Sequence, residues 1–319
     1  MKRLVFVLIA VIIVISLAAC GTEDGQPLFP TEQPSTGAPA VKQGAVTILF
    51  TGGLNGNHSD GQPQGSASYA ALKAYADQLK ADKHTVLLID GGDSLASDSA
   101  DELWDVVDAC DYDFRVPGAL ELSCGVQQLL DRTKNTNNLY LSCNLMDVER
   151  NEPLFDPYVL VEVGNAQIGF VGVTQPGSLI ESDLQRYELV GRQGGQELRD
   201  VIQSAIDQAA NAGADYVIVV GNLGTSLDDS PWTTVEVISG ITGMSAWLDC
   251  GSGAVLNGET VTDKDEHEIP VCSPGSDFAY IGQLAMNMES GAVETRLLTA
   301  FDKTDRTIWK LIEKMELDE

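Results

Sequence analysis

Polar, glycine-rich turns follow one apolar run of the sequence after another, and they hold the residues with the clearest capacity for chemistry. The turns are Gly52-Gly53, Gly91-Gly92-Asp93, Gly118, Gly221-Asn222 and Gly251-Ser252-Gly253. In α/β proteins, ligand sites form at the carboxyl ends of strands, and glycine lets a backbone approach a ligand or another loop closely. Each glycine alone could be an ordinary turn residue. Their serial arrangement predicts a shared site, present or ancestral.

The segments before these turns read as strands, and amphipathic segments lie between them. Strands are expected at 45–51, 85–90, 112–116, 139–142, 158–163, 168–173, 216–220, 246–249, 269–272, 278–288 and 293–301, with helices at 69–81, 98–110, 125–136 and 195–212. A last helix carries Ile308, Leu311, Ile312 and Met315 on one face. The alternation of strands and helices predicts an α/β fold.

The turns belong to a set of short motifs whose order is more specific than any one of them. Residues 50–56 read Phe-Thr-Gly-Gly-Leu-Asn-Gly, 88–94 Leu-Ile-Asp-Gly-Gly-Asp-Ser, 118–125 Gly-Ala-Leu-Glu-Leu-Ser-Cys-Gly, 141–144 Leu-Ser-Cys-Asn, 221–224 Gly-Asn-Leu-Gly and 248–253 Leu-Asp-Cys-Gly-Ser-Gly. In this order, the chain resembles the 5'-nucleotidase and cyclic-nucleotide phosphodiesterase branch of the calcineurin-like metallophosphoesterases. The resemblance implies a four-layer α/β/β/α sandwich of the metallophosphoesterase type.

The resemblance also implies two divalent metals, about 3.5–4 Å apart, that clamp a phosphate and activate water. It places their ligands at Gly53, Asn55, Asp93, Ala119, Asn222, Gly251 and Gly253. Such ions need carboxylate, imidazole or amide donors, and four of these seven residues have no donor side chain. Asp93 alone keeps the residue of the family, and Leu120 replaces the histidine that assists the leaving group. We therefore expect a degenerate cleft with a vestigial Asp93, no catalytic residue and no metal cofactor.

Two classes of function remain open. The donor count favours a non-catalytic binding or scaffold protein, a pseudoenzyme of the family that uses the old cleft or a loop surface. The alternative is a residual metal-dependent phosphoesterase or 5'-nucleotidase that acts on extracellular nucleotides through rearranged ligands. His58, three residues past Asn55, could supply such a ligand but is expected to point elsewhere. A substrate-binding lipoprotein that feeds a transporter is a third class, but the motif order lacks the two similar lobes it would need.

The first 44 residues predict an anchor rather than part of the fold. Residues 1–19 read as a lipoprotein signal peptide, with Lys2 and Arg3 before an apolar run and small residues before Cys20. Cys20 is expected to carry a lipid, and residues 20–44 are expected to form a flexible stalk. The metallophosphoesterase-like domain then covers 45–319, with no carboxyl-terminal nucleotide-recognition domain. The predicted location is the bacterial cell envelope, with the protein lipid-anchored to the outer face of the membrane.

The charge of the chain limits its partners. The sequence has 47 acidic and 19 basic residues, a formal net charge of −28, which disfavours nucleic acid. The expected partners are the membrane, through the lipid, and a protein or small-molecule ligand whose identity stays open. Four of the acidic residues, Asp98, Asp101, Asp105 and Asp108, follow one face of an expected helix. They could collect calcium, but a solvated helix surface is expected, because calcium sites need oxygens that converge from a loop.

Five cysteines follow Cys20 in the sequence. The resemblance makes the strands before Cys124 and Cys143 neighbours, and it does the same for those of Cys250 and Cys272. We predict the disulfides Cys124–Cys143 and Cys250–Cys272, with Cys110 as a free thiol. Each bridge would close a loop of about 20 residues and add roughly 3 kcal/mol in the chain-entropy model. Buried free cysteines, packed as small apolar residues, are the alternative.

Overall fold

The computed structural model describes residues 44–58, 66–95, 101–134, 139–225, 232–251 and 253–318. The expected signal peptide, Cys20 and the stalk before Gly44 lie outside these residues, as do Asp98 and Ser252. Within the described ranges, we find no helix that combines the length and apolar character needed to span a membrane.

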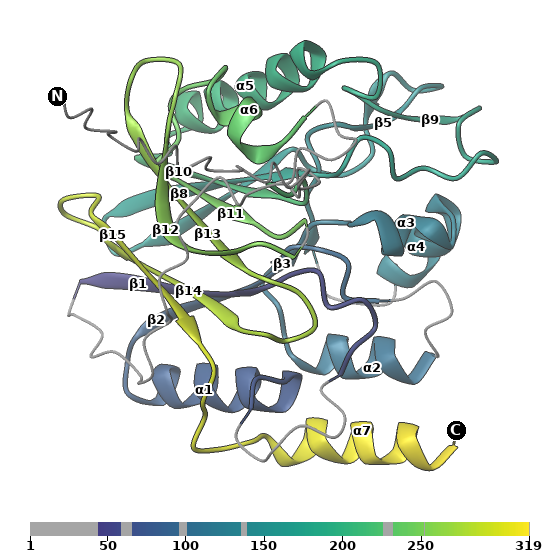
Figure 1. Ribbon diagram of the computed structural model, residues 1–319, viewed down its shortest axis with the longest axis vertical. Coiled ribbons are helices and arrows are strands. Elements are labelled where there is room, and N and C mark those ends of the chain that lie inside the picture. The colour runs from purple at the N-terminus through teal and green to yellow at the C-terminus, as the bar shows by residue number, and fades with distance from the viewer. Residues whose placement is uncertain are drawn as a thin grey trace, which may run out of the picture.

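The first sheet has six strands in the order β15-β14-β1-β2-β3-β4. Its strands are β1 (Ala45–Thr51), β2 (Thr85–Asp90), β3 (Phe114–Arg115), β4 (Leu139–Tyr140), β14 (Ile281–Asn287) and β15 (Val293–Leu298). The four strands β1 to β4 are parallel, so their carboxyl ends meet at one edge. The helices α1 (Tyr69–Ala81), α2 (Asp101–Ala109) and α7 (Arg306–Asp318) cover its outer face (Figure 1).

The second sheet also has six strands, in the order β12-β13-β11-β10-β8-β7. Its strands are β7 (Tyr158–Val163), β8 (Ala166–Val173), β10 (Tyr216–Gly221), β11 (Ala246–Asp249), β12 (Val255–Thr262) and β13 (Glu268–Pro274). Strands β7 and β8 form the expected hairpin across Gly164 and Asn165. The helices α5 (Gly195–Asn211) and α6 (Thr234–Ile238) pack on the outer face of this sheet.

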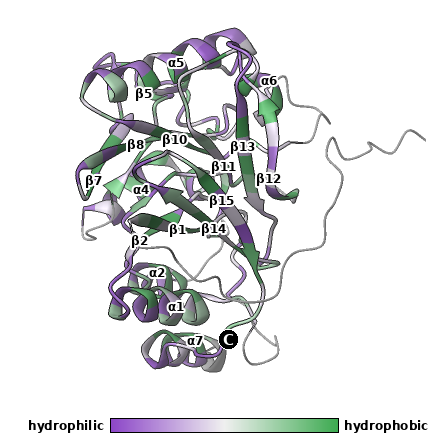
Figure 2. Ribbon diagram, turned by 90° about the vertical axis from the view of Figure 1, so that its left-hand side faces the viewer, coloured by the Kyte–Doolittle hydropathy of each residue, from purple (hydrophilic) through white to green (hydrophobic). Residues whose placement is uncertain are grey.

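Apolar side chains of both sheets fill the space between them. Phe50 and Ile89 of the first sheet share this core with Phe170, Ile218 and Leu248 of the second. Both faces of the central strands are therefore buried, which explains why their sequences are continuous apolar runs. The result is the predicted four-layer α/β/β/α sandwich, with α5 at one end of the stack and α7 at the other (Figure 2).

Several boundaries differ from those expected. The helix expected at 125–136 is the shorter α4 (Val126–Thr133), and a further short helix that was not expected, α3 (Ala119–Ser123), precedes it; Gly125, with a φ of 95°, separates the two. Strand β14 starts at Ile281 rather than near residue 278, since Asp277 and Phe278 have φ values of 55° and 57° and form a turn. A third, three-stranded sheet lies beside these helices and was not expected; it consists of β5 (Leu145–Asp147), β6 (Glu152–Pro153) and β9 (Tyr187–Leu189).

Candidate functional site

The turns after β1, β2, β10 and β11 meet at one place, as the serial glycines predict. Gly53 N–H donates to the carbonyl of Gly92 at 2.9 Å, and Asn55 N–H donates to that of Asp93 at 2.7 Å. The amide Nδ2 of Asn222 donates to Gly91 O at 3.1 Å and to Cys250 O at 3.3 Å. The four loops are thus joined directly to one another by backbone hydrogen bonds and by the side-chain amide of Asn222.

Cys250 occupies the centre of this junction. A Cβ atom at Gly91 would overlap the side chain of Cys250, and a Cβ at Gly52 would overlap it from the loop after β1. A Cβ at Gly251 would overlap the backbone N of Leu223. These glycines therefore allow loops of the same chain to approach one another closely. Gly253 differs, because a Cβ there would meet open space.

Asp93 receives backbone groups at the same junction. Its carboxylate Oδ1 accepts the N–H of Leu120 at 2.8 Å, so the residues that replace part of the third motif cap Asp93 through the main chain. Burial raises the pKa of Asp93, while the Leu120 N–H and the Asn222 side chain oppose that shift. N–H donors hold the carboxylate of Asp93. Such donors would be found around an ordinary turn residue and also around a retained metal ligand.

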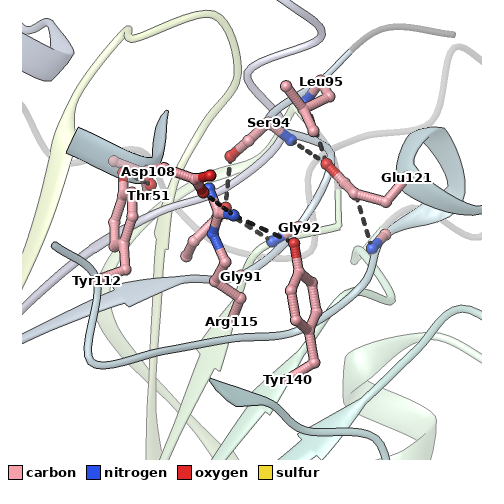
Figure 3. A network of polar contacts seen from close by, with 12 residues as sticks. Thr51, Gly91, Gly92, Ser94, Leu95, Asp108, Tyr112, Arg115, Glu121 and Tyr140 are labelled. Carbon is pink, nitrogen blue, oxygen red and sulfur yellow. Dashed lines mark hydrogen bonds and ion pairs between the residues drawn. The ribbon is translucent and has the colours of Figure 1, made fainter. Parts of the chain in front are cut away.

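Glu121 organises the turn that contains Asp93, a role that sequence reasoning missed. Its carboxylate accepts the N–H groups of Asp93, Ser94, Leu95 and Gly118, at 2.8–3.1 Å. Figure 3 shows this carboxylate facing the turn. Burial, followed by the nearby charges of Asp93 and Asp90, raises the pKa of Glu121 to about 8. A glutamate three residues after Gly118, at the start of a helix, is the sequence signal that could have found it.

A buried ion network lies beneath the turn (Figure 3). Arg115, only 1% exposed, lies 3.3 Å from Asp90 through Nε and 3.1 Å from Asp108 through Nη1. Asp90 also accepts the N–H of Gly92 and the hydroxyl of Ser94. Asp90 and Arg115 are register partners on β2 and β3. The network therefore connects the turn after β2 to the adjacent strand.

Asp249 connects the loops after β10 and β11. Its Oδ1 accepts the N–H of Gly224 at 3.0 Å and that of Gly251 at 3.1 Å, while no described residue is hydrogen bonded to Oδ2. Burial raises the pKa of Asp249 from its ordinary 3.8 to about 6, against the opposing effect of these donors.

The raised pKa of Asp249 makes stability depend on pH. The folded state favours the neutral acid of Asp249. The stability that this preference adds to the folded protein is complete below pH 3.8 and is lost as the pH rises through about 6. Asp249→Asn keeps an acceptor for both N–H groups and removes the charge. We expect the variant to be more stable than the wild type above neutral pH, by on the order of 2 kcal/mol, and equal to it near pH 4. Urea unfolding across this pH range measures the difference.

Asp263→Asn is the matched control for this prediction. Asp263 is also buried, but hydrogen bonds from His267, Asp265 and Thr242 outweigh desolvation and lower its pKa. Its contribution has the opposite sign, so Asp263→Asn should be less stable than the wild type at neutral pH, with the deficit shrinking in acid. The same pH trend in both variants would contradict the assignment to Asp249.

The predicted disulfides are absent, which corrects that expectation. All five cysteines among the described residues are free thiols. The thiol of Cys124 donates to Glu121 O at 3.0 Å, while Cys143 packs in the core between the second sheet and its helices. Cys250 and Cys272 both face the core between the sheets, yet remain separate. Neighbouring strands do not ensure that two side chains reach bonding geometry.

Thiol counting tests this arrangement. In a Cys20→Ser variant, the remaining cysteines are Cys110, Cys124, Cys143, Cys250 and Cys272. We expect five reactive thiols per chain after denaturation without reductant, and few before it, because burial raises the pKa of four of these thiols strongly. Three thiols would indicate one bridge, and a single thiol would indicate both.

Metal binding at the junction can be judged from the donors present. Among the described residues, no group of three or more His, Cys, Asp or Glu side chains is placed to hold an ion. Of the positions where the resemblance places metal ligands, Asp93 supplies the one carboxylate and Asn55 and Asn222 supply amides, while Gly53, Ala119 and Gly251 supply no side-chain donor. Two closely spaced divalent ions need several anionic or imidazole ligands, so this donor set does not fit a two-metal centre.

The curated proteins whose sequences resemble this chain share one name. A 2',3'-cyclic-nucleotide 2'-phosphodiesterase/3'-nucleotidase from Salmonella typhimurium is 24% identical over 211 residues, which are 59% of this chain and 32% of the relative. The protein of the same name from Haemophilus influenzae is 26% identical over 140 residues, 40% of this chain and 20% of the relative. The chain thus spans a third or less of the length of these curated relatives. No family model matches the chain.

Solved structures agree with the sequence relatives. A 5'-nucleotidase precursor from Thermus thermophilus superposes with a TM-score of 0.68 and 16% identity, over 85% of this chain and 58% of that one. The calcineurin-like phosphoesterase YfkN from Bacillus subtilis gives 0.64 and 17%, over 87% of this chain and 98% of that one. The predicted fold class and the resemblance to this branch of phosphoesterases are confirmed.

The same comparisons contradict the expectation that no cofactor is used. The relatives and neighbours are nucleotidases and phosphoesterases by name. Enzymes that hydrolyse phosphate esters with this kind of site use two divalent metals, so a pair of such metals is the group to consider at the strand ends. The donor set of this chain does not match that group. The disagreement arises because positions such as Gly53, Ala119 and Gly251, where a two-metal site would need ligands, have no side-chain donor.

Proposed function

Because the chain carries a 5'-nucleotidase-like phosphoesterase domain, we propose that this domain acts as a non-catalytic binding or scaffold module. The closure of the strand-end junction by Cys250 supports this proposal most strongly. The thiol side chain lies where Gly52 and Gly91 leave room, and Asn222 hydrogen bonds to both adjoining loops. A phosphate and its nucleophilic water would have to displace these protein groups. Leu120, which cannot transfer a proton, agrees with this interpretation.

Hydrolysis assays test the proposal directly. We expect the wild type to hydrolyse 2',3'-cyclic AMP, 3'-AMP, 5'-AMP and bis-p-nitrophenyl phosphate no faster than an Asp93→Asn variant, with Mn²⁺, Mg²⁺ or Zn²⁺ supplied in the assay. Asp93→Asn is the matched control because it removes the one carboxylate at the expected ligand positions with little change of shape. Metal-dependent turnover that this variant loses would contradict the proposal and would favour the alternative, a residual phosphoesterase.

We further propose that the domain is displayed at the outer face of a bacterial membrane through a lipid on Cys20. The apolar run, the small residues before Cys20 and the stalk composition support this location. Cys20→Ser should leave the protein unprocessed or release it from membranes in fractionation of expressing cells. A Cys20→Ser protein that still carries lipid and sediments with membranes would contradict the anchor.

A further inference from the structure

Strand β7 forms one edge of the second sheet, and it lacks the features that normally protect a sheet edge. It pairs with β8 alone and lies at the left margin of the stack in Figure 2. Its sequence, Tyr-Val-Leu-Val-Glu-Val, contains no proline or lysine, and its register with β8 has no bulge. Unpaired backbone groups on a regular apolar strand attract another strand, so soluble proteins usually block them. The edge at β7 is therefore open to pairing.

The other three edges of the two large sheets are short, irregular or covered. Strand β4 has two residues. Strand β12 carries a bulge between Asn257 and Glu259. Strand β15 lies against β12, where the Thr295 hydroxyl donates to Asn257 O at 2.7 Å. Among the described strands of these two sheets, only β7 is an edge that combines length, regularity and a free side.

The hairpin to β8 determines which backbone groups of β7 face outward. The loop has two residues, so the flanking pair Val163 and Ala166 exchanges hydrogen bonds across the hairpin. In an antiparallel pair, these bonds recur at every second residue. The N–H and C=O groups of Leu160 and Glu162 therefore point away from β8. No described residue bonds to them from outside the sheet.

Contacts just before β7 agree with this direction and show that the edge accepts an extended segment. The carbonyl of Pro157 faces β8, where it accepts the N–H of Gly172 at 3.3 Å, and the carbonyl of Asp156 faces outward. There it accepts the N–H of Ser142 at 3.0 Å, next to a parallel bridge between the two segments. The chain thus already pairs one extended segment with this edge, beside the outward groups of Leu160.

The side chains of β7 indicate what an added strand would carry. Tyr158 and Leu160 pack toward α5, and both are half-buried. Val159 and Val161, also half-buried, pack toward the core between the sheets. An added strand would therefore meet apolar side chains on both faces of the sheet. Glu162 is exposed and is the one charged residue of β7. A basic side chain opposite Glu162 is favourable, whereas a second copy of this chain, with its net charge of −28, would bring like charge.

We propose that the β7 edge binds an extended polypeptide segment of a partner, which becomes a further strand of the second sheet. The segment exchanges backbone hydrogen bonds with Leu160 and Glu162, carries apolar residues at neighbouring positions and places a lysine or arginine opposite Glu162. Such a segment would be the ligand of the binding module proposed above, on which this inference rests for its role. None of the junction residues takes part, so the hydrolysis assays and the binding test can fail independently.

The probe is the peptide acetyl-Lys-Val-Thr-Val-Lys-Val-Thr-amide, and calorimetry at low salt measures its binding to the full chain. An added strand turns alternate N–H groups toward its neighbour. Methylation of the backbone nitrogens at the second and fourth residues should therefore differ in effect from methylation at the third and fifth. We expect one of these peptides to bind about tenfold more weakly than the parent, and the other to stay within about threefold of it. Replacing both lysines by glutamate should weaken binding about tenfold.

Variants of Glu162 locate the binding on the protein. Glu162→Pro removes an outward N–H that no described residue uses, and should weaken binding about tenfold. Glu162→Gln, the matched control, keeps that N–H and should weaken binding less than about threefold. Circular dichroism checks that both variants are folded, and the comparison of N-methylated peptides needs only the wild type. Equal weakening by both N-methylated peptides, an absence of saturable binding, or a wild-type dimer in sedimentation that Glu162→Pro disrupts would each overturn the proposal.

Discussion

Replacing Arg115 by methionine is expected to destabilise the domain by about 3–5 kcal/mol, because it leaves a buried carboxylate without its counter-charge. Asp90 and Arg115 are 3% and 1% exposed, and the Arg115 guanidinium also contacts Asp108 and the hydroxyl of Tyr140. Methionine fills much of the same volume, so the loss reflects charge rather than a cavity. Urea unfolding monitored by tryptophan fluorescence measures it.

Two variants show whether the charge is responsible. Asp90→Asn combined with Arg115→Met removes both charges and should recover part of the lost stability. Arg150→Met removes an arginine whose side chain is 65% exposed and pairs with Asp147 and Glu152 at 3.8 and 3.7 Å, so it should cost less than about 1 kcal/mol. Equal losses for Arg150→Met and Arg115→Met, or no recovery in the double variant, would argue against the buried pair as the cause.

The second large effect is expected from Gly251→Ala, which should cost about 3 kcal/mol. The new Cβ would overlap backbone atoms of Asn222, Leu223 and Gly224, and a backbone that is hydrogen bonded to Asp249 and Val173 cannot easily move away. The loop after β10 or the loop after β11 must then leave the junction. Denaturant midpoints at constant m-value report the loss.

Gly177→Ala is the control for this substitution. A Cβ at Gly177 would meet nothing within 4 Å, so the change should stay within about 0.5 kcal/mol. If Gly251→Ala were as mild as Gly177→Ala, the loops after β10 and β11 would have room between them. The junction could then open to admit a ligand, and the proposed non-catalytic role would lose its main support.

Closure at the junction also explains how the chain can keep the fold of 5'-nucleotidases without the side chains that would bind metals. The scaffold of two sheets and their helices matches that of 5'-nucleotidases over most of the chain, because it depends on buried apolar strands rather than on ligands. In a metal-dependent relative, ions would tie the strand-end loops together. Here the Asn222 amide, the Asp249 carboxylate and the packing of Cys250 join those loops.

Much of the fold was determined by the sequence itself. Runs such as Val86–Ile89 and Val217–Val220 contain enough β-branched and apolar residues to specify buried strands locally. The turns that follow them contain glycine or asparagine, so the positions of the strand ends were also readable. Because parallel strands place their carboxyl ends at one edge, the gathering of Gly53, Asp93 and Asn222 followed from this pattern.

Tertiary structure alone decided what these turns do. Nothing near Gly91 in sequence shows that Cys250, more than 150 positions away, packs against it, and the pairing of Asp90 with Arg115 depends on the register of β2 and β3. The disulfide prediction was wrong for the same reason, because the order of strands does not specify the direction of each side chain. Local sequence sets which segments are strands, whereas side-chain contacts between distant segments form only when the sheets pack.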